Sequence, residues 1–181
     1  MKKIFALSFM IVFSLSVFSQ APGIQWQKCL GATNNDWGYD VIQTQDGGYL
    51  TVGTTLSNDG NATGNHGGAN MLVIKLDSGG NVQWHNCYGG TSDEEAFSVS
   101  QTNDGSYIVT GITNSNDGDV SGNHGLRDYW VVKLSVNGTI QWQRCLGGSN
   151  NEGDGFLGCS VKQTTSGDIF LLDTRAQMMA M

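Results

Sequence analysis

A repeat of 58 residues is the feature that most limits how this chain can fold. A Gln-Trp pair recurs at that spacing, and each copy is followed by a cysteine and then by a glycine. The tryptophans are Trp26, Trp84 and Trp142, and the cysteines are Cys29, Cys87 and Cys145. Asp46-Gly47 and Asp104-Gly105 keep the same register. A period of this length indicates supersecondary units that stack side by side and share a core.

Each repeat unit is predicted to contain four short β-strands. The expected strands are residues 38–44, 48–54, 71–77 and 81–89 in the first unit, and 95–102, 106–113, 129–135 and 139–147 in the second. Asp-Gly turns join the first two strands of each unit. Helix should be nearly absent, because no segment of the mature chain shows a sustained 3.6-residue apolar period. The fold expected is therefore all-β, a β-propeller-like repeat of four-stranded antiparallel blades. A β-solenoid or an open stack of hairpin sheets is the alternative.

The repeat does not continue to the end of the sequence. The chain divides into a signal peptide (1–20), blade 1 (21–81), blade 2 (82–139), a partial third repeat (140–173) and a non-repeat tail (174–181), with an insertion at 153–158. This makes about two and a half blades, whereas a closed propeller needs at least four. We therefore expect either a truncated or frameshifted fragment of a longer repeat protein, or self-association through unpaired blade edges.

The first twenty residues are typical of an export signal. Lys2 and Lys3 precede the uncharged apolar stretch Ile4–Phe18, which is too short to span a bilayer. Its removal leaves seven basic and sixteen acidic residues, a formal charge of −9. We expect a secreted or cell-surface protein without a membrane span, and such an acidic surface argues against nucleic acid as a partner.

Two motifs give the chain a family resemblance. The first is Asp-Gly-Gly-Tyr-Leu-Thr-Val-Gly at 46–53, and the second is Leu-Val-Ile-Lys-Leu-Asp-Ser-Gly-Gly-Asn-Val-Gln-Trp at 72–84. Together they resemble the repeat of secreted bacterial β-propeller-like proteins of the kind often exported by type IX secretion. The resemblance covers residues 24 to about 172 and implies a fold and an extracellular address. It implies no catalytic residues.

Aromatic residues are the first candidates for ligand binding. The periodic Trp26, Trp84 and Trp142 are interpreted as packing residues between blades, with a sugar-stacking ladder as the alternative. Less regular aromatic residues are the preferred candidates for an exposed patch that binds a ligand. They are Trp37, Tyr39, Tyr129 and Trp130.

Two long loops, 55–70 and 113–128, carry clustered side-chain oxygens of the type that bind calcium. The candidate calcium ligands are Asn58, Asp59, Asn61, Asn116, Asp117 and Asp119. The alternative, which we favour, is that Asn-Asp-Gly only makes the turn, because neither loop has the full alternating-carboxylate pattern. We expect no cofactor other than this calcium. His66 and His124 occupy equivalent loop positions and are interpreted as structural, because neither has a Cys or His at ligand spacing.

Three of the four cysteines occupy the same position in successive units. Equivalent positions of neighbouring blades are expected to lie too far apart for a disulfide, so these cysteines are interpreted as buried thiols. A bridge between Cys145 and Cys159 remains open at this point.

The sequence contains no nucleophile elbow, phosphate-binding loop or His-Glu-x-x-His motif. Glu94 and Glu95 are adjacent, and adjacent residues of a strand point to opposite faces, so they cannot converge on one bond. We therefore expect a non-catalytic extracellular binding or scaffold module for glycan or cell-surface protein ligands. A secreted glycan-active hydrolase with an incomplete propeller is the alternative.

Overall fold

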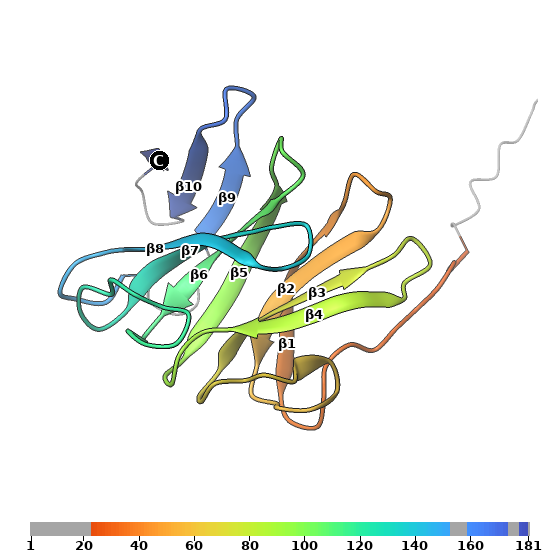
Figure 1. Cartoon of the computed structure of the whole chain (residues 1–181), viewed down its shortest axis with the longest axis horizontal. Coiled ribbons are helices and arrows are strands. Elements are labelled where there is room, and N and C mark those ends of the chain that lie inside the picture. Colours follow the sequence, from red (N-terminus) through yellow and green to blue (C-terminus); the bar gives the residue numbers. More distant parts are fainter. Residues whose placement is uncertain (1–22, 153–158, 174–177, 181) are drawn as a thin grey trace, which may run out of the picture.

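The computed structural model describes residues 23–152, 159–173 and 178–180 (Figure 1). These residues form eleven antiparallel strands and a single 3-10 turn, η1 (Gly60–Ala62), which confirms the all-β prediction. The expected signal peptide and the expected insertion at 153–158 lie outside the described residues. No helix in the described part of the chain is long and apolar enough to cross a membrane.

Two four-stranded sheets repeat one topology, in which each strand pairs with the next along the chain. The first sheet has β1 (Asp36–Gln43), β2 (Tyr49–Thr55), β3 (Asn70–Leu76) and β4 (Val82–Tyr88). The second has β5 (Glu94–Gln101), β6 (Tyr107–Thr113), β7 (Asp128–Leu134) and β8 (Ile140–Leu146). The strands predicted from the sequence match these within two residues at each end.

The third sheet has three strands. They are β9 (Cys159–Gln163), β10 (Ile169–Asp173) and β11 (Met178–Ala180), in the order β11-β10-β9. Part of the tail expected to lie outside the repeat thus pairs with β10, through Phe170↔Ala180 and two further residue pairs. The described sheets lie side by side without closing into a ring (Figure 1).

Asp-Gly turns shape the first hairpin of each sheet, as the sequence predicts. In the first sheet, Asp46 Oδ1 accepts the amide of Gly48 at 3.0 Å, and Gly47 has a φ of +82°. Glycine adopts this left-handed conformation without steric cost. The equivalent Gly105 of the second sheet has a φ of +81°.

The fourth strand of each of the two four-stranded sheets packs on the following sheet. The Trp84 indole, from β4, donates its Nε1 hydrogen to the carbonyl of Val136 in the β7–β8 turn at 3.1 Å. Trp26 lies against Tyr49 of the first sheet, with ring centroids 5.4 Å apart. The prediction of packing between blades is thereby confirmed for Trp84, whereas Trp26 packs on the first sheet of its own unit. The sheets are offset from the sequence units, because each four-stranded sheet takes its fourth strand from the start of the next unit.

The first strands of the three sheets, β1, β5 and β9, are neighbours (Figure 1). Asp40 Oδ2 accepts the amide of Val99 at 2.9 Å and so links β1 to β5. Ser98, one repeat later, accepts the amide of Val161 at 3.4 Å and links β5 to β9. The largest buried cluster fills the space between the first two sheets and includes Leu50 and Trp130. Hydrophobic contact and edge hydrogen bonds therefore hold successive sheets together.

Candidate functional site

A β-bulge sits at the same place in the first strand of both complete sheets. Tyr39 is the extra residue between Gly38 and Asp40 in β1, and Phe97 is its equivalent in β5. The strand opposite the β1 bulge comes so close that a Cβ on Gly53 would lie 1.8 Å from the carbonyl oxygen of Trp37. Bulges of this kind redirect side chains, and here they turn Tyr39 and Phe97 toward the same space.

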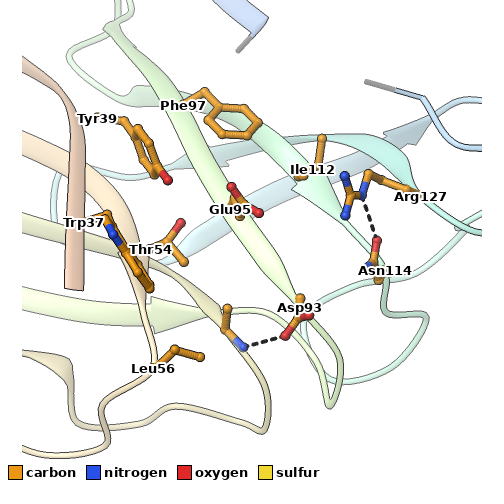
Figure 2. A pocket seen from close by; sticks show the side chains of 11 residues that line it. Trp37, Tyr39, Thr54, Leu56, Asp93, Glu95, Phe97, Ile112, Asn114 and Arg127 are labelled. Atoms are coloured by element: carbon orange, nitrogen blue, oxygen red, sulfur yellow. Dashed lines mark hydrogen bonds between the residues drawn. The ribbon is translucent and has the colours of Figure 1, made fainter. Parts of the chain in front are cut away.

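That space is a hollow of about 630 Å³ between the first two sheets (Figure 2). Most of its lining comes from equivalent positions of the two repeats. The pairs are Trp37 with Glu95, Tyr39 with Phe97, Thr54 with Ile112, Leu56 with Asn114, and Ala69 with Arg127; Asp93 completes the lining. The two repeats thus place different chemistry at corresponding points, so the hollow is not symmetric.

One wall of the hollow is aromatic. The side chain of Trp37 is 44% exposed and that of Tyr39 is 48% exposed, as predicted from the sequence. Tyr39 and Phe97 meet edge to face, with ring centroids 5.4 Å apart and an interplanar angle of 74°. This contact between sheets fixes the Tyr39 ring while much of its surface stays open to a ligand.

Polar groups form the opposite side (Figure 2). Arg127 Nε donates a hydrogen bond to Asn114 Oδ1 at 3.2 Å, and Asp93 Oδ1 accepts the amide of Ala69 at 2.8 Å. Burial raises the pKa of Glu95, the positive charge of Arg127 opposes that rise, and the negative charge of Asp93 adds to it. The hollow therefore offers hydrogen-bond acceptors and donors beside an aromatic surface.

Tyr129 and Trp130 do not belong to this surface, and the prediction that they form an exposed patch was wrong. Tyr129 is 5% exposed and Trp130 is fully buried. Both lie on β7, which pairs with β6 on one side and β8 on the other, and its two faces are covered by separate hydrophobic clusters. The Trp130 indole donates its hydrogen to Gln143 Oε1 at 2.8 Å.

The residues that the second repeat contributes to the hollow were not predicted as ligand-binding residues from the sequence. These are Asp93, Glu95, Phe97, Ile112, Asn114 and Arg127. The signal that could have found most of them is the period itself, since Glu95 and Phe97 stand 58 residues after Trp37 and Tyr39.

Most of the candidate calcium ligands make hydrogen bonds that organise their loops. Asn58 Oδ1 accepts the amide of Gly64 at 2.9 Å, and Asp59 Oδ1 accepts the amide of Thr33 at 3.1 Å. Their equivalents Asn116 and Asp117 accept the backbone amides of Gly122 and Thr91. Asp119 Oδ2 accepts the backbone amide of Gly89. The backbone amide of Asn61 donates to the carbonyl of Gly31. The described residues contain no group of three or more His, Cys, Asp or Glu side chains arranged around a metal position. These contacts support the turn-making role.

The thiols of the repeat differ in environment. Cys87 and Cys145 are buried, as predicted, and their sulfurs lie near the carbonyls of Ala62 and Ser121 at 3.3 and 3.4 Å. Burial raises the pKa of each thiol to about 11. Cys29 is exposed, so the prediction of burial was wrong there, because the described part of the chain places no sheet on its outer side. Cys145 is a thiol, not the partner in a disulfide.

The described structure thus provides one hollow in which exposed aromatic rings and hydrogen-bonding side chains face the same space. Such an arrangement can orient a polar ligand that also has an apolar face. Comparison of the chain with protein-family models and with curated proteins finds no match.

Proposed function

We propose that this chain is a non-catalytic extracellular module of β-propeller-like architecture that binds glycans in the hollow between its first two sheets. The observation that carries the proposal is the pairing of exposed Trp37 and Tyr39 with the polar groups of Glu95 and Arg127 in one space (Figure 2). The export signal expected at residues 1–20 supports the extracellular address.

A sugar ring matches this chemistry. Its faces carry C–H groups that pack on aromatic rings, and its rim carries hydroxyls that both donate and accept hydrogen bonds. Trp37 and Tyr39 supply aromatic surface, the carboxylate of Glu95 accepts from hydroxyls, and Arg127 donates to them. A volume of about 630 Å³ lies within the range usual for small-ligand sites.

The alternative, a glycan-active hydrolase, has one observation in its favour. Asp93 and Glu95 line the same hollow, and glycoside hydrolysis uses two carboxyl groups on either side of the scissile bond. Asp93 Oδ1 already accepts the amide of Ala69, which gives this carboxylate a structural role. Binding without cleavage is therefore the function we propose.

The test is to screen the mature chain against soluble polysaccharides and oligosaccharides and to measure affinity by calorimetry. Trp37→Ala and Tyr39→Ala should each weaken binding roughly tenfold, equivalent to ~1.4 kcal/mol of lost contact. Tyr39→Phe keeps the ring and should bind within about threefold of wild type. Val41→Ala changes an exposed residue of the same strand outside the hollow and serves as the matched control.

Two results would contradict the proposal. One is the absence of glycan binding, or binding that Trp37→Ala and Tyr39→Ala leave unchanged. The other is release of reducing ends that Glu95→Gln abolishes, which would establish the hydrolase instead.

A further inference from the structure

Where the first sheet meets the second, the repeat places an amide beside a carboxylate. We call this the first junction. At the second junction, where the chain leaves the second sheet for the third, it places two carboxylates. Asn70, the first residue of β3, corresponds to Asp128, the first residue of β7. Glu94 corresponds in the same way to Glu152. The amide–carboxylate pair of the first two sheets has thus become a carboxylate–carboxylate pair where the chain leaves the second sheet for the third.

At the first junction the acidic side chain has its hydrogen-bond donors. Asn70 Nδ2 donates to Glu94 Oε2 at 3.3 Å, and the amide of Gly90 donates to the same oxygen at 2.9 Å. The Thr113 hydroxyl donates to Glu94 Oε1 at 2.7 Å. Glu94 is completely buried, and these donors replace the water that burial removes.

At the second junction two carboxylate oxygens lack donors. Asp128 is also completely buried, and its Oδ2 accepts from the amide and Nδ1 of His124 at 3.1 and 2.7 Å. Asp128 Oδ1 and Glu152 Oε2 are both buried and have no hydrogen-bond partner in the described part of the chain. Each lies 2.5 Å from the point where a Cβ on Gly147 would stand, so the two oxygens are at most twice that distance apart.

Two buried carboxylate oxygens this close together, each without a donor, are stabilised by a positive charge between them. The nearby Arg127 does not supply it, because neither oxygen has a hydrogen-bond partner and the Nε of Arg127 donates to Asn114 instead. Cys145 lies in the same negative region. Burial is the main cause that raises the pKa of its thiol, and the negative charges of Asp128 and Glu94 add to the rise. The donors available here are hard carboxylate oxygens, which suit calcium better than softer metals.

We propose that Asp128 and Glu152 bind a calcium ion where the second sheet leads into the third, with water completing its coordination. Glu152 as a whole residue is partly exposed, although its Oε2 is buried. The amide of Glu152 also donates to the carbonyl of Arg127 at 2.8 Å, and Asn151 forms a parallel bridge with Arg127. The ion thus ties Asn151 and Glu152 to the start of β7.

The experiment measures calcium binding by calorimetry and thermal unfolding of the mature chain, with about 5 mM calcium chloride or with a chelator. That concentration exceeds the dissociation constants of about 0.1 to 1 mM usual for extracellular calcium modules. Calcium should raise the Tm of the wild type by about 3 to 5 °C.

Internal symmetry supplies the matched variants. Asp128→Asn recreates the amide–carboxylate pair of the first junction, so it should lose the calcium response and be more stable than wild type in chelator. Asn70→Asp should create a second acidic pair with Glu94 and increase the calcium response. Asp117→Ala changes a loop candidate outside this junction and should leave the response unchanged.

A wild type that shows neither heat of binding nor a change in Tm would overturn the proposal, and so would an Asp128→Asn variant that still responds to calcium. Glu152→Gln provides the same test should Asp128→Asn fail to fold. The wild type could instead show no response to calcium and become more stable in mild acid, with no such gain in Asp128→Asn. That result would overturn the calcium site and show that the two carboxylates share a proton.

Discussion

Lys75 Nζ lies 2.9 Å from Asp46 Oδ2, although Lys75 is in β3 and Asp46 is in the turn between β1 and β2. The lysine side chain is buried and also donates to the carbonyl of Leu76 at 3.0 Å and to Gln83 Oε1 at 3.1 Å. Lys133 and Asp104 repeat the ion pair in the second sheet at 2.6 Å. Each pair therefore holds the first hairpin turn against the third strand.

Replacement of Asp46 by Asn should weaken the acid sensitivity of the fold. Hydrogen bonds from Thr44, Lys75 and Gly48 hold the pKa of Asp46 well below its usual range. Because the folded-state pKa is the lower one, this stabilisation is complete above the unfolded value of about 3.9 and is lost as the pH falls below it. Asp46→Asn should cost about 1 to 2 kcal/mol at pH 7 and progressively less in strong acid.

Urea unfolding at pH 7 and at about pH 2.5 checks this prediction. Asp104→Asn is the parallel variant, because Lys133 and Thr102 lower the pKa of Asp104 in the same way. A free-energy difference between Asp46→Asn and wild type that does not change with pH would show that the carboxylate charge is unimportant.

A methyl group at Gly53 should disturb the bulge that presents Tyr39. The added Cβ would lie 1.8 Å from the carbonyl oxygen of Trp37, a backbone atom that moves only with β1. Gly53→Ala should destabilise the fold by about 1 to 3 kcal/mol and should also weaken ligand binding in the hollow. Denaturant unfolding measures the first effect, and glycan titration of the folded variant measures the second.

Gly38→Ala is the control for that variant. Gly38 belongs to the same bulge, but a Cβ there would meet no atom within 4 Å. Its stability should stay within about 0.5 kcal/mol of wild type. Equal losses in Gly38→Ala and Gly53→Ala would mean that glycine flexibility, and not close approach, matters at this place.

The thiols should react in a fixed order. Cys29 is exposed, whereas Cys87 and Cys145 are buried and have pKa values raised to about 11. At pH 8 only about one in a thousand of the buried thiols is thiolate, the reactive form. N-Ethylmaleimide should label Cys29 in the native protein within minutes and the other two only after denaturation. Peptide mapping by mass spectrometry follows the order, and labelling of native Cys87 at the rate of Cys29 would refute the packing described.

The strands could be predicted because their signals are local. The run before Asp46-Gly47 and the run after it form β1 and β2, and a turn of a few residues fixes their pairing. The 3-10 turn η1 was not predicted, because a single turn of this kind leaves no periodic pattern in the sequence.

The hollow could be predicted only in part. Exposure of Trp37 and Tyr39 was correctly expected, but their partners Phe97 and Glu95 come from another sheet, and the packing between sheets decides whether they meet. Trp130 shows the opposite error. An aromatic residue in an apolar strand looked available to a ligand, although a strand that is apolar on both faces is usually covered on both.

The packing of Trp84 against the β7–β8 turn has a consequence for how the protein comes apart. The outer strand of the first sheet depends on the second sheet for part of its burial, and the second sheet depends on the third in the same way through Trp142, which packs with Val161 and Leu171. Each sheet that melts therefore removes support from its predecessor. Unfolding should spread from the third sheet toward the first as one cooperative event, so that a local loss at one junction lowers the melting temperature of the whole described chain.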